Sequence, residues 1–562
     1  MKKFAFSGRM FVFLVFPVGL VMLVEWLAPY SARAEAPAPR LVVLLTVDQL
    51  GRDKLDPALP GGLGRLAREG RVFSEGSLAH SLAETCPGHA ALSTGRHPGR
   101  AGLPSNYTVD RESGTVEYCL EDDPDASGVL GIQGPSGRSP RRMRVDALGD
   151  WLQQERSGAL VLSVSGKDRA AIALGGQHPT GAYWLVGRRE GRLGFTTSRY
   201  YAPELPSWVR DWNGWGTEDS AGLLARVPEQ WAHRPEAAKR VDPKRPDAYG
   251  AESAEFIERE SVHRLRGEQM QETVARIYRS PFLDALTLDF AAAAARELGL
   301  GSDDVPDLLA VSLSATDTVG HEFGPESHEA ADALLRLDGW LGNWLSALEA
   351  RVGRGRVLVA LSSDHGVMPI PEWLSETGRS RCPVKPGRVS LDAMRGELQR
   401  HLHVELGGML SWPRVWLYHA GLQLTVNRSN AAEAKVPVER VVTTAEAWLE
   451  ARPEVAAAWT TTELADSAHP MAQRYRRSHD PERSGDLAVQ VEPDCLVSRY
   501  TAGTSHGTPY DYDSAVPIVF WGAGIRPGRD ARSADTVDVA PTLARLLGIE
   551  LPADLDGVSL VD

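Results

Sequence analysis

Short runs of Val and Leu, each followed by an aspartate, constrain the fold of this chain most. The run LVVLLTV precedes Asp48, LLAVSLSAT precedes Asp317, and VLVALSS precedes Asp364. Runs of this length and composition are typical of strands buried on both faces of a parallel sheet. Helical patterns at 282–298 and 328–351 alternate with them, as in βαβ units. We therefore expect an α/β fold with a mostly parallel central sheet flanked by helices.

The polar residues that follow these strands are expected to lie close together. In open α/β sheets, ligands bind at the carboxyl ends of the strands. His321 follows Asp317 after three residues, His365 follows Asp364 directly, and His506 lies in TAGTSHGTP. Because carboxylates and imidazoles together suit zinc, the pattern predicts a metal site at this edge of the sheet.

Each of these pairs also has an interpretation without a metal. An aspartate and a histidine four residues apart, such as Asp317 and His321, occur often by chance, although one helical turn could bring both to one ion. Asp364 ends a strand, and Gly366 allows the chain to turn there. A buried carboxylate needs a partner, which can be an arginine as well as a metal ion.

Thr85 has two possible roles in the segment AETCPGHAA. Pro87 suits the first turn of a helix, so Thr85 can be a simple helix cap. The same position places its hydroxyl at a helix N-terminus, where free N–H groups attract anions. There it could act as a nucleophile toward a phosphoryl group.

Lys167 and Arg169 follow a predicted strand at 159–164. Residues two apart on an extended chain point the same way, so both cations could reach one phosphoryl group. The alternative is a solvated basic turn paired with Asp168. Asn106, in LPSNYT, is either a neutral hydrogen-bond donor of the same site or only a turn residue.

Two stretches interrupt the strand–helix alternation. Residues 181–260 are rich in Trp, Tyr, Pro and charged side chains, and 371–498 also depart from the pattern. We expect both to be inserts in a single catalytic domain that spans 35–562. A further short strand is expected at 170–174.

The N-terminus has the layout of a secretory signal peptide. Lys2, Lys3 and Arg9 precede an apolar stretch at 10–24, and small residues follow up to a cleavage site after Ala34. The alternative is an uncleaved anchor, but the stretch is short for a span and a proline and a glutamate interrupt it. The mature chain is expected to be periplasmic or secreted, without stable membrane insertion.

The four cysteines fit an exported protein, because disulfides persist outside the cytoplasm. Three pairings are possible. We favour Cys86 with Cys119 and Cys382 with Cys495, since each pair falls within one region of the chain. Their spacing does not suit a cysteine-based zinc site.

Charge and the remaining motifs exclude several classes of function. The net charge is -13 without a basic stripe, so nucleic acid is not expected as a stable partner. No HExxH occurs, and GIQGPSGRS lacks the GK[ST] ending of a phosphate-binding loop. GTSHG at 503–507 matches GxSxG by chance, because no strand–turn–helix context surrounds it. The sequence does not fix the oligomeric state, for which a monomer is the working expectation.

The polar residues occur in the order of the alkaline phosphatase superfamily. The chain resembles its bacterial phosphomonoesterases, which have a Thr nucleophile and two zinc ions and are related to type I phosphodiesterases and nucleotide pyrophosphatases. The segments AETCPGH, SGKDR and FTTSRYYAPELPSWVRDWN also carry the resemblance, which covers nearly the whole mature chain. The matching residues are Asp48, Thr85, Asn106, Lys167, Arg169, Asp317, His321, Asp364, His365 and His506.

The resemblance implies an alkaline-phosphatase-like core with two inserted cap regions, two Zn²⁺ ions as cofactors and small phosphate monoesters as substrates. Thr85 is expected to form a phosphothreonine, while Asn106, Lys167 and Arg169 bind the phosphoryl oxygens. One zinc is expected on Asp317, His321 and His506. The other is expected on Asp48, Asp364, His365 and the Thr85 oxygen.

Two other functions remain open. One is that of the related phosphodiesterases and nucleotide pyrophosphatases. Those enzymes lack the Lys/Arg pair and accommodate the second ester group of their substrate in its place. A non-catalytic zinc-binding envelope protein would keep the fold without turnover. Sulfatases are excluded because CPGHA lacks their Cys-x-Pro-x-Arg pattern.

The chain departs from the resemblance beside Asn106, where Tyr107 follows and the usual Trp is missing. Mn, Co or Fe could replace zinc on such ligands.

Overall fold

The computed structural model describes Met1 and residues 38–131, 137–187, 193–215, 222–253, 261–407 and 414–561. Residues Ala38–Asp562 form one compact unit, and the fold below is that of this unit. The predicted signal peptide and its cleavage site after Ala34 lie outside the described residues. Within the described ranges, no helix combines the length and the apolar character that a membrane span requires.

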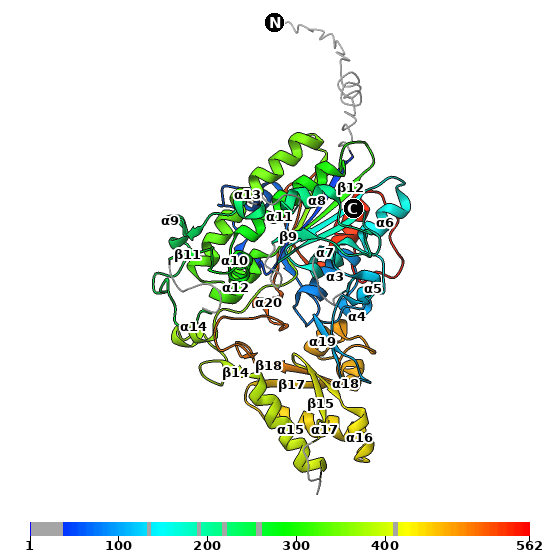
Figure 1. The fold of residues 1–562 in the computed structure, drawn as a ribbon, viewed down its shortest axis with the longest axis vertical. Helices are drawn as coiled ribbons and strands as arrows, with labels where there is room; N and C mark the ends of the chain where they lie inside the picture. The colour runs from blue at the N-terminus through cyan, green and yellow to red at the C-terminus, as the bar shows by residue number, and fades with distance from the viewer. Residues whose placement is uncertain are drawn as a thin grey trace. The chain divides into compact units, whose positions relative to one another are not determined.

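A large sheet forms the centre of the unit, and β9 and β12 are labelled in it in Figure 1. The sheet has nine strands in the order β21-β2-β20-β13-β1-β12-β7-β8-β9. Its middle strands, from β13 to β8, run parallel, while β20 and β9 run antiparallel to their neighbours. The predicted mostly parallel sheet is therefore confirmed. The strands are β1 (Leu41–Val47), β2 (Arg71–Ser77), β7 (Val161–Ser165), β8 (Gly181–Val186), β9 (Gly194–Thr196), β12 (Asp307–Leu313), β13 (Val357–Ser362), β20 (Ile518–Gly522) and β21 (Gly528–Asp535).

The central strand β1 is buried on both faces, which explains its uninterrupted apolar sequence. Leu45 and Val47 point into the core on one face, and Val42 and Leu44 into the core on the other. The register pairs Val47 with Leu313 and Thr46 with Ser362, so β1, β12 and β13 end side by side. The residues after these strands consequently meet at one edge.

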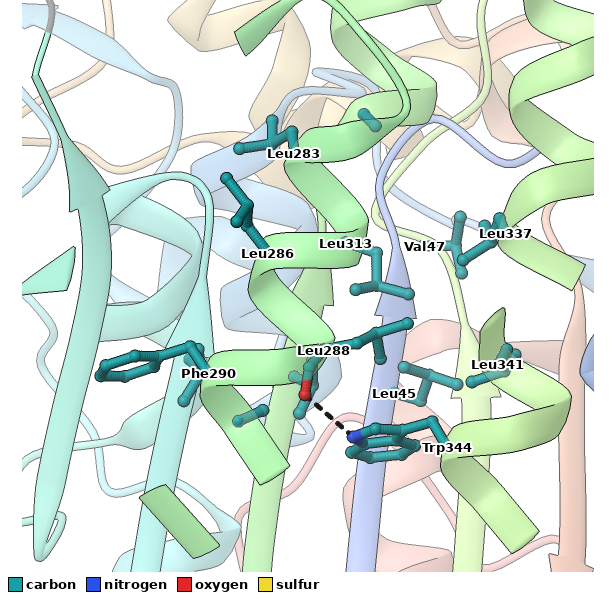
Figure 2. Close-up of a cluster of buried hydrophobic side chains, with 14 of the residues drawn as sticks. Leu45, Val47, Leu283, Leu286, Leu288, Phe290, Leu313, Leu337, Leu341 and Trp344 are labelled. Carbon is teal, nitrogen blue, oxygen red and sulfur yellow. Dashed lines mark hydrogen bonds between the residues drawn. The ribbon is translucent and has the colours of Figure 1, made fainter. Parts of the chain in front are cut away.

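Helices α11 (Phe282–Glu297) and α13 (His328–Val352) cover one face of the sheet. Figure 2 shows Leu45 between Leu288 of α11 and Leu341 of α13, beside Trp344. The Trp344 Nε1 donates a hydrogen bond of 3.1 Å to the Leu288 carbonyl. Each fully buried leucine of this kind contributes about 1.5–3 kcal/mol. On the other face, α6 (Leu148–Glu155) and α21 (Val539–Leu546) complete a second core.

The segment 371–498 contains a separate four-stranded antiparallel sheet with its own apolar core, in the lower part of Figure 1. Its helices α15 (Leu391–Gly407) and α17 (Val438–Glu450) supply Leu398 and Val441 to that core. The strands are β15 (Leu417–Ala420), β16 (Gln423–Val426), β17 (Val455–Thr460) and β18 (Leu487–Val491).

The segment 181–260 begins within the large sheet, because β8 and β9 are two of its strands. After α8 (Ser207–Asn213), the chain forms β10 (Gln230–Ala232), which pairs with β11 (Val262–Arg264) as an antiparallel ribbon.

The predicted strand at 170–174 is wrong, because Asp168–Gly175 form the helix α7. Its sequence DRAAIALG is rich in alanine, the best helix former, and a short apolar run does not by itself distinguish a strand from a helix. Lys167 is the N-cap of α7 and Arg169 lies in its first turn. The two cations therefore do not lie on an extended chain as predicted.

The structure contains the two favoured disulfides, Cys86–Cys119 and Cys382–Cys495, which confirms that pairing. These bonds use all four cysteines of the sequence.

Candidate active site

The residues that follow the central strands meet at their carboxyl ends. Asp48 follows β1 directly, and Asp364 lies two residues beyond the end of β13. Asp317 lies on α12 (Ala315–Phe323), the helix that follows β12. Thr85 is the first residue of α3 (Thr85–Thr94), and its N-cap is Glu84, so the predicted cap position is one residue too late. The side chains of Asp48, Thr85, Lys167, Asp317, Asp364 and His365 are all buried.

Asp317 has potential ligands on two sides: it forms a group with His365 and His506 whose ligand atoms all lie within 4.8 Å of one another, and it also contacts His321, which the sequence predicts in place of His365. The Asp317 Oδ1 lies 3.2 Å from the His321 Nε2 and 3.6 Å from the His506 Nε2. Asp317 and His321 are brought together by one turn of α12, the spacing that the sequence pattern suggests.

Asp48, Asp364 and His365 form a second group. The His365 Nε2 lies 3.5 Å from the Asp48 Oδ1 and 3.4 Å from the Asp364 Oδ2. Within the described residues, none of these three atoms has a hydrogen-bond partner. Asp364 is paired there with His89 and His365 rather than with an arginine. Because the buried Asp48 Oδ1 and Asp364 Oδ2 accept no hydrogen bond in the described residues, a cation between them fits this group.

The three histidines share one orientation that suits metal binding. The Nδ1 of His321 contacts the Thr504 carbonyl at 2.8 Å, that of His365 contacts Gly366 at 2.9 Å, and that of His506 contacts Ala83 at 2.6 Å. A carbonyl can only accept, so each Nδ1 is the donor and each Nε2 keeps its lone pair. Metal-ligating histidines are typically fixed in this way.

Lys167 lies between the two groups of ligands. Its Nζ is 2.6 Å from the Asp48 Oδ2 and 2.5 Å from the Asp317 Oδ2. Burial raises the pKa of Asp48 well above its usual value, and the Asp317 and Asp364 carboxylates raise it further. Burial alone would also raise the pKa of Asp317, but Lys167 and His321 hold it well below its usual value. The site therefore concentrates negative charge that favours bound cations.

Arg169 reaches the predicted nucleophile directly. Its Nη2 donates a hydrogen bond of 3.3 Å to the Thr85 Oγ1. Asp168 does not pair with the Lys167 or Arg169 side chain; its carboxylate contacts Arg138 Nε at 2.7 Å and the Tyr118 hydroxyl at 2.6 Å. The structure therefore does not show the alternative interpretation, in which Lys167 and Arg169 form a solvated turn whose charges pair with Asp168.

Asn106 is held against the start of α3. Its Oδ1 accepts a hydrogen bond of 2.8 Å from the Cys86 N–H, which leaves its amide nitrogen as a donor for another group. The Asn106 N–H donates at 2.6 Å to the Glu84 carboxylate, which also accepts from the Ser105 hydroxyl. Glu84 was not predicted, although it directly precedes Thr85.

Two further residues support the ligands without having been singled out for that role. The Gln49 Nε2 donates to the Asp317 Oδ1 at 2.8 Å, and the Gln49 N–H to the Asp364 Oδ1 at 3.2 Å. Gln49 has a φ of 69°, a strained conformation for a residue other than glycine. The His89 Nδ1 lies 3.1 Å from the Asp364 carboxylate. The sequence offers no signal for these contacts beyond the position of Gln49 beside Asp48.

Comparison with known families identifies the class of enzyme that uses this fold. The family model described as type I phosphodiesterase / nucleotide pyrophosphatase matches residues 42–511. Because this match covers most of the sequence, the chain belongs to that family, within the alkaline phosphatase superfamily, and is a phosphoric ester hydrolase.

Individual relatives match over almost their whole length. Alkaline phosphatase PafA of Elizabethkingia meningoseptica is 29% identical, with 96% of this chain and 97% of that protein covered. Alkaline phosphatase PhoK of a Sphingomonas species is 30% identical over 93% and 91% of the two chains. A Myroides odoratus protein named calcium-transporting ATPase is 31% identical over 92% of each. A crystal structure of PafA superposes with a TM-score of 0.82 at 28% identity, covering 93% of this chain and 98% of that one.

Proposed function

We propose that the chain is an alkaline phosphatase that hydrolyses phosphate monoesters through a covalent phosphothreonine at a two-zinc site. The observation that carries this proposal is the contact of Arg169 with the Thr85 hydroxyl, with Lys167 beside the same site. A monoester has a dianionic phosphoryl group, so two cations near the nucleophile favour it over a diester. The alkaline phosphatase names of two relatives support the same activity.

The two groups of ligands suit two zinc ions, because carboxylates and imidazoles with free Nε2 lone pairs are the donors that zinc takes. One ion would be held by Asp317, His321 and His506. The other would be held by Asp48, Asp364, His365 and the Thr85 oxygen. Two ions so placed would supply charge stabilisation to the attacking and leaving oxygens of the displacement.

The protein's own groups then divide the reaction between them. The Thr85 Oγ1 loses its proton to solvent and attacks phosphorus; a new O–P bond forms, the ester bond breaks, and the departing alkoxide takes a proton from water to leave as the alcohol. Water next cleaves the phosphothreonine, returning the Thr85 hydroxyl and releasing inorganic phosphate. The N–H groups at the start of α3, the Asn106 amide and the Arg169 guanidinium are placed to bind the phosphoryl oxygens, where charge is spread during transfer.

Lys167 has a double role in this proposal. Its ammonium compensates the Asp48 and Asp317 carboxylates when no other cation does. Its flexible four-carbon side chain allows it to turn to a phosphoryl oxygen when cations occupy those carboxylates.

The alternative within the family is a phosphodiesterase or nucleotide pyrophosphatase, as the description of the family model allows. We expect p-nitrophenyl phosphate to be hydrolysed with a kcat/KM at least about 100-fold above that of bis-p-nitrophenyl phosphate, since the loss of one well-placed charged hydrogen bond costs about that factor. The assay should include ATP, because one relative carries the name of an ATPase. Equal or faster diester turnover would contradict the proposal, and no turnover with zinc bound would favour a non-catalytic zinc-binding protein.

Removal of metal is expected to abolish activity. Dialysis against a chelator should leave the chain folded but inactive, because the two disulfides and the apolar cores do not depend on the ions. Zinc should restore turnover more fully than manganese or cobalt, measured by p-nitrophenol release together with the metal content of the protein. Full activity of metal-free protein would rule out the metal-dependent mechanism.

Export is the other part of the proposal, with the signal peptide removed after Ala34. The two disulfides support it, since such bonds persist in oxidising compartments. N-terminal sequencing of the protein from the periplasmic or culture fraction should give Glu35 as the first residue. A membrane-bound chain that keeps its N-terminal segment would show that this segment is an anchor.

A further inference from the structure

A group of two histidines and a glutamate, none of them part of the candidate active site, lies where the β10–β11 ribbon contacts α13. His233 follows β10, His263 lies on β11, and Glu329 lies in the first turn of α13. The ribbon pairs Trp231 with His263, which brings the two histidines close together. His263 and Glu329 are fully buried, and the His233 side chain is 10% exposed.

The three potential ligand atoms form a nearly regular triangle. The His233 Nε2 lies 3.2 Å from the His263 Nε2 and 3.8 Å from the Glu329 Oε1, and the His263 Nε2 lies 3.4 Å from the same oxygen. A point equidistant from these three atoms is about 2.0 Å from each. That value matches the Zn–N distance of about 2.0–2.1 Å and the Zn–O distance of about 2.0–2.2 Å.

The surroundings of the Glu329 carboxylate are a second observation that points to a cation ligand. Both of its oxygens are buried and accept no hydrogen bond from any residue in the described ranges. A buried carboxylate in this condition is costly unless a positive charge lies beside it. The two histidine Nε2 atoms face the same point as the Oε1, and they cannot both carry a proton there.

Neighbouring groups orient the ligands as they do around metal ions. The His233 Nδ1 lies 3.4 Å from the Asp247 carboxylate, on the opposite side of the ring from the Nε2 that faces Glu329. Such a carboxylate fixes the tautomer of a ligating histidine. Asp332 on α13 accepts hydrogen bonds from the Trp231 Nε1 at 2.6 Å and the Arg234 N–H at 2.8 Å. These bonds attach the residues before and after His233 in the chain to α13, the helix that carries Glu329.

We propose that His233, His263 and Glu329 bind a divalent transition-metal ion of the size and preference of Zn²⁺, with water completing its coordination. The ion fastens the β10–β11 ribbon to the start of α13. This site does not depend on the proposed function, because it shares no ligand with the candidate active site.

Crystals of the wild-type protein grown with zinc should test the proposal directly. We expect an anomalous difference peak at the zinc edge within bonding distance of the three ligand atoms, separate from any peaks at Asp317 or Asp48. No peak there at millimolar zinc would overturn the proposal and leave a hydrogen-bonded cluster. Peaks at the active site alone would do the same while supporting the two-zinc site, so the two proposals fail independently.

Matched variants provide a second readout. Glu329→Gln keeps the shape of the side chain but removes its charge, and should lower the zinc content of the purified protein by one ion per chain. His328→Ala is the control, because His328 precedes Glu329 and stacks on the His233 ring at a centroid distance of 6.4 Å, but its own nitrogens face Asp247 and the Arg245 carbonyl rather than the Glu329 Oε1. It should keep the wild-type zinc content. Unchanged zinc content in folded Glu329→Gln would contradict the proposal; if that variant does not fold, the anomalous map of the wild type decides.

Discussion

Replacement of Thr85 by alanine is expected to reduce phosphate monoester turnover by at least about 10³-fold, because it removes the proposed nucleophile. The hydroxyl is buried at the start of α3 and accepts a hydrogen bond from Arg169, which alanine cannot replace. Turnover of p-nitrophenyl phosphate and trapping of the phosphoenzyme from labelled substrate measure the effect.

Thr85→Ser is the matched control for this experiment. Serine keeps the hydroxyl at the same helix N-terminus and should still form a phosphoenzyme. Zinc content should change little in either variant, since Asp48, Asp364 and His365 remain. Normal turnover of Thr85→Ala would show that Thr85 is only a residue of the first helical turn.

Replacement of both Lys167 and Arg169 by alanine is expected to reduce kcat/KM for monoesters by about 10²- to 10⁴-fold, since two charged hydrogen bonds to the phosphoryl group are lost. The effect on any diester turnover should be much smaller, because a diester presents one negative charge and a second ester group at the same place. The ratio of the two kcat/KM values is the quantity to measure.

Arg40→Ala is a matched control for the loss of a cation. Arg40 precedes β1, at the amino end of the strand, and pairs with the exposed Asp304. Such a surface ion pair contributes about 0–1 kcal/mol, so turnover should not change. If the double variant lowers monoester and diester turnover equally, Lys167 and Arg169 have a structural role instead.

The parts of the fold that the sequence predicts best are those with a strong periodic signal. Val and Leu runs such as β1 alternate between two cores, so their burial on both faces determines their sequence. The Ala-rich segment of α7 lacks such a signal, and the strand predicted at 170–174 is wrong. The composition of the sequence changes at residue 181, where the predicted insert begins. The large sheet does not end there, because its strands β8 and β9 come after that residue.

The candidate site shows the same limit. Asp48, Asp317 and Asp364 are predictable because each follows a strand whose end is fixed by the sheet. Glu84, Gln49 and His89 could not be predicted, because their partners come from distant parts of the chain. The His233, His263 and Glu329 group likewise appears only when the ribbon folds against α13.

The Cys86–Cys119 bond links the proposed chemistry to the redox state of the compartment in which the chain folds. Cys86 directly follows Thr85, and its N–H holds the Asn106 side chain; Cys119 donates its N–H to the Asn106 carbonyl. A single covalent bond therefore links the proposed nucleophile to the segment that presents the proposed phosphoryl-binding amide. In a reducing cytoplasm the Cys86–Cys119 disulfide does not form. A precursor that has not yet been oxidised therefore holds Thr85 and Asn106 together by non-covalent contacts alone.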